Sequence, residues 1–254
     1  MNCAYCSEPG ALTKEHVWPR WLHASADRSL KYHAAPNKVL PSEQVVNDVC
    51  ARCNNGPLSD LDGYARSLYA RYFGKRYETA KRSIFRYDFE KLSRWLLKTS
   101  YNTARAARSP DADLLGQYAS CIVTPSSVPA YVDLSVSLMG QMIVIDPASG
   151  RRTTTELTWC RSGYVGLTLA QSAAVIARIV IIHCWCFMIV VRRNGAGPID
   201  EALLRPLLPG QKILPGGEPT RVPTVTFDAD GVLGHFREKR HLYEAARMRR
   251  KPNR

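Results

Sequence analysis

The chain has 254 residues, enough for one large domain or for a small module joined to a larger one. With 45% hydrophobic residues, its composition is ordinary for a soluble globular protein and can bury a sizeable core. The formal net charge of +13 favours an anionic partner, nucleic acid before a membrane surface, although basic surfaces also arise without either partner.

Four of the eight cysteines form two Cys-x-x-Cys pairs, Cys3–Cys6 and Cys50–Cys53. The first residues contain no basic segment followed by an apolar run, so we expect no secretory signal and a cytoplasmic location. In a reducing compartment such pairs are more typical of a metal site than of disulfides. We therefore expect the four thiolates to bind one structural zinc ion, with four unrelated cysteines as the alternative.

Short strands and a helix are predicted in the first part of the chain. We expect strands at 12–17 and 44–49, with a proline-containing loop over 24–43 between them. Apolar residues at helical spacing then predict a helix over 58–73.

A basic stretch occupies residues 66–108, where twelve Lys and Arg stand against three Asp and Glu, with aromatic residues interleaved. Helical spacing of apolar residues predicts a helix over about 89–107. We expect exposed cations here and beside the first strand to neutralise phosphates without regard to base sequence. The candidates are Lys14, Arg20, Lys75, Arg76, Lys81 and Arg82. The alternative is a solvated helix face over an aromatic core.

The second half is richer in strands. Residues 130–145 alternate in the manner of strands, and 153–159 do so more weakly. We expect a helix over 167–178, one buried central strand over 180–191, and a hairpin over 225–236.

One long apolar stretch, residues 164–191, needs a test for a membrane span. Arg178 lies in its middle, and Gln171 and His183 are also inside it; each is costly in hydrocarbon. We therefore expect no membrane partner. The segment 183–186, His-Cys-Trp-Cys, is interpreted as core, with a metal site as the alternative.

Three motifs surround the cysteine pairs: Glu15-His16-Val17-Trp18-Pro19 between them, Asn47 before the second pair, and Asn54-Asn55-Gly56 after it. Together they resemble the HNH, or ββα-metal, endonucleases. Members of that family often carry two zinc knuckles around an Asp/Glu-His-x-x-Pro segment, a middle Asn, and a His or Asn after the last cysteine. The resemblance covers about the first quarter of the chain.

The resemblance implies a role for each site residue. His16 would be the general base that activates water, and Asn47 would orient its imidazole. Glu15 and Asn54 would hold a catalytic Mg²⁺ or Mn²⁺, with Asn55 competing with Asn54 for that role. Asn in place of the more common His fits a hard Mg²⁺ better than a transition metal.

Simpler roles stay open for the same residues. The three residues 54–56 could only cap the following helix, and a lone histidine before an aromatic residue and proline is often structural. Adjacent residues on a strand also point to opposite faces. Glu15 and His16 can therefore converge on one ion only if the backbone kinks or the ion sits at the strand's edge.

We expect an α+β fold with four parts. A zinc-stapled ββα-metal (HNH) module over 1–63 would precede a basic helical region over 64–108. A β-rich α+β accessory domain would follow over 109–236, and a basic tail over 237–254.

The expected function is that of a metal-dependent DNA endonuclease hydrolysing phosphodiester bonds, in phage defence, restriction or a mobile element. A catalytically decayed zinc-binding DNA-binding module, or an RNase of the same fold, is the alternative. Double-stranded DNA is the expected partner. A homodimer or an activating protein partner stays open.

Overall fold

A computed structural model of the chain describes most of its residues. They are 1–25, 30–33, 38–41, 44–124, 132–145, 150, 152–155, 160–193, 202, 205–217 and 219–225. The predicted basic tail over 237–254 lies outside them, as does all but the first residue of the hairpin predicted over 225–236.

Helices and strands are mixed along the chain, which is consistent with the expected α+β class. The helical elements are α1 (Arg20–Ser25), α2 (Ala51–Cys53), η1 (Asn54–Leu58), α3 (Ser59–Leu68), η2 (Tyr69–Phe73), α4 (Tyr77–Ala80), α5 (Phe89–Ala107), α6 (Ala112–Gly116), α7 (Ala119–Val123), α8 (Leu169–Ala174) and η3 (Arg205–Leu207). The strands are β1 (Leu12–His16), β2 (Leu30–His33), β3 (Lys38–Pro41), β4 (Val45–Cys50), β5 (Ile84–Phe85), β6 (Val132–Met139), β7 (Met142–Ile145), β8 (Arg152–Thr155), β9 (Cys160–Tyr164), β10 (Val175–Ile182), β11 (Trp185–Arg192), β12 (Gln211–Ile213), β13 (Thr220–Arg221) and β14 (Thr224–Val225).

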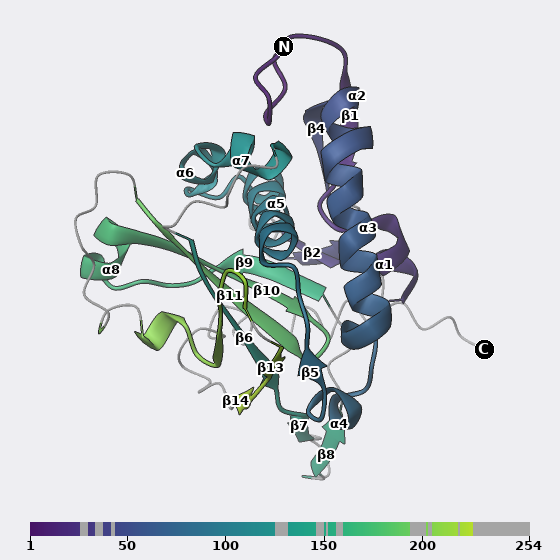
Figure 1. The fold of residues 1–254 in the computed structure, drawn as a ribbon, viewed down its shortest axis with the longest axis vertical. Helices are drawn as coiled ribbons and strands as arrows, with labels where there is room; N and C mark the ends of the chain where they lie inside the picture. The colour runs from purple at the N-terminus through teal and green to yellow at the C-terminus, as the bar shows by residue number, and fades with distance from the viewer. Residues whose placement is uncertain are drawn as a thin grey trace.

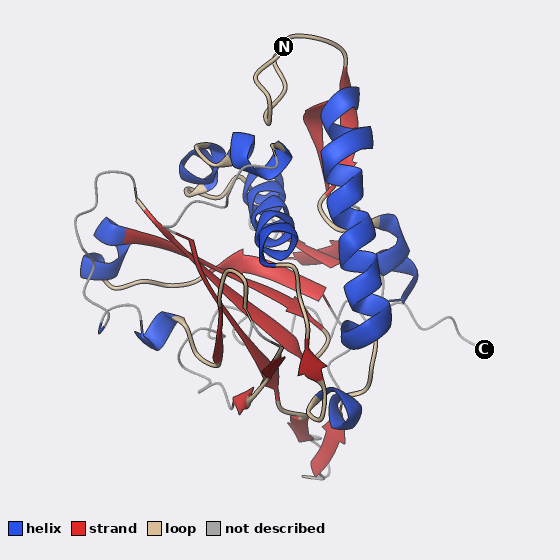
Figure 2. Ribbon diagram, viewed as in Figure 1, coloured by secondary structure: helices blue, strands red, loops and turns tan. Residues whose placement is uncertain are grey.

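Helix α5 joins two parts of the structure (Figure 1). It packs against α3 and β4 on one side and against β9 and β10 of the large sheet on the other. Figure 2 shows the strands of this sheet gathered together, with α5, α6 and α7 beside it. The N-terminal strands and α3 therefore reach the sheet through α5.

The N-terminal unit consists of the antiparallel pair β1–β4 and the helical segments that follow β4. The strands predicted at 12–17 and 44–49 are confirmed to within one residue. The helix predicted over 58–73 is present as α3 and η2, and helical turns also precede it. The backbone bends at Gly56, with φ −101° and ψ −109°, before Pro57, which lacks the N–H that an unbroken helix would use.

The loop predicted over 24–43 is wrong in part. Helix α1 reaches Ser25, and β2 and β3 form an antiparallel pair in which Leu30 lies opposite Pro41. A proline at the end of a strand pair need not donate to the ladder. Pro41 is therefore compatible with a strand at this position.

Helix α5 has the bounds that its sequence predicts, 89–107. The Asp88 side chain accepts a hydrogen bond from the Lys91 backbone N–H at its start. Every residue from 92 to 104 is buried, because other elements surround the helix. The expected exposed basic surface therefore does not extend over residues 92–104 of α5.

The large sheet has six strands, in the order β12-β6-β11-β10-β9, with β14 also paired to β6. All of these pairs are antiparallel except β14–β6, which is parallel. The strands predicted over 130–145 are present as β6 and β7, and β8 covers the described part of 153–159. Val225, where a hairpin was expected to begin, belongs to β14.

Two predictions in this sheet are wrong. The helix expected over 167–178 ends at Ala174, where β10 begins at once. The single strand expected over 180–191 is a hairpin of β10 and β11 that turns at His183, a non-glycine residue with φ 52°. Both strands are buried on both faces, so no alternation of polar and apolar residues marks their boundaries.

One hydrophobic core runs through the whole arrangement. Tyr5 and Val17 from the N-terminal unit, Trp95 from α5 and Trp185 from the sheet belong to the same cluster of buried residues. A second cluster, which includes Ile179, lies on the opposite face of the sheet. Among the helices of the described part, none is long and apolar enough to cross a membrane.

Candidate metal centre and the residues around it

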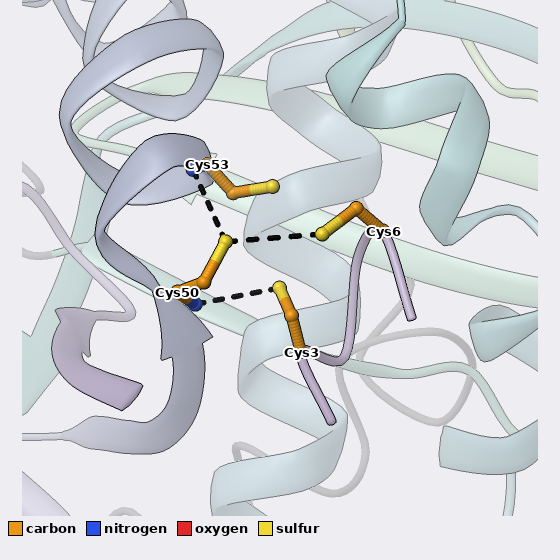
Figure 3. Close-up of side chains that lie close together, drawn as sticks. All are labelled: Cys3, Cys6, Cys50 and Cys53. Carbon is orange, nitrogen blue, oxygen red and sulfur yellow. Dashed lines mark hydrogen bonds between the residues drawn. The ribbon is translucent and has the colours of Figure 1, made fainter. Parts of the chain in front are cut away.

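The four predicted cysteines converge on one point (Figure 3). The sulfur atoms of Cys3, Cys6, Cys50 and Cys53 all lie within 4.8 Å of one another. The Sγ atoms of Cys6 and Cys50 are 3.8 Å apart. Four thiolates at about 2.3 Å from a tetrahedral zinc ion have their sulfurs about 3.8 Å apart. The cluster therefore fits a metal ion such as zinc.

Local structure brings the two pairs together. Cys50 ends β4 and Cys53 ends α2, while the Cys3–Cys6 turn is fastened to β4 by a hydrogen bond of 2.8 Å from the Ala4 N–H to the Asp48 carbonyl. The Cys50 N–H also points to the Cys3 sulfur, at 3.4 Å.

Backbone N–H groups favour ionisation at this centre. Burial opposes ionisation of Cys3, but N–H groups of Cys50, Cys6 and Tyr5 outweigh it and lower the Cys3 pKa to about 6. Burial raises the pKa of Cys53. The pKa values of Cys3 and Cys53 therefore shift in opposite directions in the metal-free cluster. A bound metal ion would hold both as thiolates, since it binds the deprotonated form of every ligand.

A second set of contacts ties the Cys3–Cys6 turn to α5. The Tyr5 hydroxyl donates to Asn102 Oδ1 at 2.6 Å. The Arg105 guanidinium carbon lies 4.3 Å from the centroid of the Tyr101 ring and 5.2 Å from that of Tyr5, and Arg105 is ion-paired with Asp48. The metal centre is therefore anchored to the central helix from both β4 and the turn.

Glu15 lies in a buried ion pair. Its Oε1 is 2.7 Å from the Lys98 Nζ, which is also 2.7 Å from Asp62 Oδ1. Trp95 Nε1 donates to the same Asp62 oxygen at 3.1 Å. Burial raises the Glu15 pKa, and the neighbouring Lys98 ammonium opposes this.

His16 contacts a different element from its neighbour. Arg20 Nε on α1 donates to His16 Nε2 at 3.1 Å, and the His16 side chain is half-buried, while that of Glu15 is buried. The two side chains therefore project differently from β1, as expected for adjacent strand residues. The strand pair is irregular here, because a step of two residues on β1, from Thr13 to Glu15, lies opposite a step of three residues on β4, from Val49 to Val46.

Asn54 fastens the start of the helical segment to β1. Its Nδ2 donates to Thr13 Oγ1 at 2.8 Å and to the Lys14 carbonyl at 2.9 Å. Both contacts use the amide nitrogen, so Oδ1 would be the atom offered to a metal. Asn55 is exposed, as is Asn47 on β4.

The residues that the resemblance assigns to a catalytic Mg²⁺ or Mn²⁺ do not form an open ligand set. Glu15 gives Oε1 to Lys98, and Asn54 is held through its nitrogen. Within the described ranges, the four cysteines are the only group of three or more His, Cys, Asp or Glu side chains close enough to share an ion.

The predicted phosphate-binding cations are mostly on the surface. Lys81 differs from the others, because it is half-buried, pairs with Glu78 and lies over the Tyr77 ring. The others, Lys14, Arg20, Lys75, Arg76 and Arg82, are exposed. The interleaved aromatic residues pack with or against the core rather than forming a surface.

Sequence reasoning missed the buried charges of α5. Trp95, Lys98, Asn102 and Arg105 recur at helical spacing of three or four residues, so they share one stripe of the helix. A polar stripe inside a helix whose neighbours are apolar is the signal that could have identified them.

No family model, curated protein or solved structure matches the chain.

Proposed function

We propose that this chain is a metal-dependent nuclease of HNH type that hydrolyses phosphodiester bonds in DNA. One observation carries the proposal. The four-cysteine cluster fastens two antiparallel strands to a following helix, with His16 on the first strand and Asn54 bonded to that strand from the helix start. This arrangement supports the proposal, as does the net charge of +13, which favours an anionic partner.

His16 serves as the general base in this proposal. Arg20 Nε donates to His16 Nε2 at 3.1 Å, so this nitrogen serves as a hydrogen-bond acceptor, the role that a general base needs toward water. The Arg20 contact must give way before Nε2 can act. An anionic phosphate is the group that would draw the guanidinium away, so Arg20 becomes a phosphate ligand as the base is released.

A zinc ion on the four cysteines would have a structural role, because a closed set of four thiolates leaves no position for substrate. It would hold His16 and Asn54 in one small unit. Mg²⁺ or Mn²⁺ would supply charge neutralisation at the phosphate. Asn54 Oδ1 is the ligand that the geometry leaves for it.

The test is plasmid cleavage by zinc-loaded protein with Mg²⁺, with Mn²⁺, and with neither. Wild type should nick or linearise the plasmid only with the added metal, and His16→Ala should lose at least a hundredfold in rate while keeping its zinc and its thermal unfolding. His183→Asn is the matched histidine control, because His183 lies in the turn of the β10–β11 hairpin. Cleavage retained by His16→Ala would refute the role of His16.

A second candidate function is that of a zinc-stapled DNA-binding module without catalysis. The buried ion pair with Lys98 favours it, because it occupies the Glu15 carboxylate that the nuclease would use to bind its metal ion. DNA binding without cleavage by wild type, under every metal condition, would support this module. Parallel assays on single-stranded RNA separate the DNase from an RNase.

A further inference from the structure

Lys98 is a charged residue where a charge is costly. It lies in the middle of α5 and its side chain is 1% exposed. The Nζ atom lies 2.7 Å from an oxygen of Glu15 and 2.7 Å from an oxygen of Asp62, whose side chains are 7% and 22% exposed. A buried ammonium persists only when such partners compensate its lost hydration. The two carboxylates therefore form a binding site for one cation, and Lys98 fills it.

A divalent ion on Glu15 would compete with this lysine. An ion bound at about 2.1 Å from Oε1 would lie no more than about 5 Å from the Lys98 Nζ. Three positive charges would then share a buried space with two carboxylates, and their repulsion is weakly screened there. The ammonium and a divalent ion therefore compete for the negative charge of Glu15.

The Glu15–Lys98 ion pair also affects the position of His16. Glu15 and His16 are adjacent on β1, and Glu15 is bound to α5 while His16 contacts α1. Fixing the Glu15 side chain on α5 therefore fixes the backbone that carries His16. Asp62 on α3 joins the same ammonium, so one lysine connects β1, α3 and α5.

We propose that Lys98, rather than a divalent ion, is the resident cation of Glu15, and that the two act as positioning residues for His16. A divalent ion used in cleavage would then be bound without Glu15. The effect on cleavage rests on the proposed nuclease function. The assignment of the cation does not.

Mn²⁺ binding tests the cation assignment without any cleavage. The electron paramagnetic resonance signal of free Mn²⁺, followed in a titration, gives the dissociation constant of the complex between Mn²⁺ and the zinc-loaded protein. Glu15→Gln should bind Mn²⁺ within about twofold of wild type, as should Asp60→Asn, an exposed carboxylate control on α3. A loss of tenfold or more in Glu15→Gln alone would overturn the proposal.

Removing the lysine should open the site. Lys98→Met leaves Glu15 and Asp62 without their cation, so the variant should gain at least tenfold in Mn²⁺ affinity or acquire a new site. Adding Glu15→Gln to that variant should abolish the gain. If Lys98→Met does not fold, Lys98→Arg takes its place and should retain the wild-type Mn²⁺ affinity, while the Glu15→Gln comparison still decides the matter.

A double-mutant cycle on thermal unfolding tests the pair itself. Glu15→Gln and Lys98→Met should each lower Tm, and the double variant should lose clearly less than the sum of the two, because it leaves neither the Glu15 carboxylate nor the Lys98 ammonium without its partner. Additive losses would show that Lys98 is not the cation of Glu15 and would overturn the proposal.

Cleavage separates positioning from ligation. If Glu15 acts through Lys98, Glu15→Gln and Lys98→Met should lose similar amounts of activity and the double variant no more than either, all with an unchanged Mn²⁺ concentration for half-maximal rate. A raised Mn²⁺ requirement in Glu15→Gln would instead show ligation and overturn the proposal. If wild type itself cleaves nothing, the nuclease proposal fails, while Mn²⁺ binding and the Tm cycle still decide the assignment of Lys98.

Discussion

Charged side chains buried in this protein occur with their partners. Arg178, in the middle of β10, is 1% exposed and donates through one nitrogen to both carboxylate oxygens of Asp111, at 3.0 and 3.1 Å. Its other terminal nitrogen donates to the Ser100 carbonyl on α5 at 3.2 Å. Burial lowers the Arg178 pKa, and Asp111 opposes this. Like Lys98, this residue connects α5 to another element by a charge that must stay paired.

The stability of the fold should depend on pH through another single residue, His183. It turns the β10–β11 hairpin and its Nε2 lies 3.0 Å from the Tyr69 hydroxyl. Burial lowers the His183 pKa below its ordinary value of 6.5, so the folded protein favours the neutral ring. As pH falls through about 6.5, the unfolded chain takes up a proton that the folded chain resists, and stability is lost.

The prediction compares wild type with His183→Asn, since Asn also adopts positive φ readily. The Tm of wild type should fall more steeply than that of the variant between pH 7.5 and 5.5. Protonation of the cysteine ligands destabilises both proteins, so the difference between them isolates His183. A wild-type Tm that falls no more steeply than that of the variant would contradict the assignment.

At the scale of elements, the metal centre fastens the Cys3–Cys6 turn to the end of β4 and to the helical segment that follows it. The turn contains no helix or strand, and its other contacts are hydrogen bonds to β4 and the packing of Tyr5 against α5. Helix α3 is different, because buried residues such as Leu61 and Leu68 belong to the main core. Loss of the metal should therefore affect the turn and the strands more than α3.

Metal removal tests this ordering. Chelation of zinc should lower hydrogen-exchange protection of β1 and β4 by at least tenfold, while the amides of β10 and β11 keep theirs. Cys50→Ser should reproduce the effect, and Cys121→Ser, a half-buried cysteine of α7, should not. Equal protection of β1 and β4 with and without chelator would refute the clamp.

The same elements show how far the sequence could predict the fold. The bounds of α5 and the cysteine cluster follow from local patterns, helical spacing and paired Cys-x-x-Cys. The β10–β11 hairpin does not, because both faces are buried and a histidine makes the turn without any Gly or Asn signal. The Glu15–Lys98 pair joins residues 83 positions apart in the chain, so only tertiary packing reveals it.

At the scale of the molecule, the packing of α5 decides where nucleic acid could bind. The basic stretch over 66–108 divides into two parts. Arg94, Lys98 and Arg105 on α5 are directed to partners inside the protein. Cations between α3 and α5 remain on the surface, around α4 and β5. Among the described residues, the exposed cations that could meet a polyanion therefore include those of this connecting segment and Lys14 and Arg20 on β1 and α1.

The salt dependence of DNA binding measures how many of these cations neutralise a phosphate. We expect the combined variant Lys75→Ala, Arg76→Ala and Arg82→Ala to lower the slope of log K against log salt by about 3, which is about 1 for each cation removed from the DNA backbone. Fluorescence anisotropy with a labelled duplex gives the slope, in the His16→Ala background so that the DNA stays intact. Lys81→Ala should lower the slope by less than about 1, because Lys81 is already paired with Glu78. Lys212→Ala on β12, where the lysine pairs with Asp133, is the control that should leave it unchanged. A slope unaffected by the combined variant would move the DNA-binding surface away from α4 and β5, because a protein that neutralises fewer phosphates must release fewer counterions.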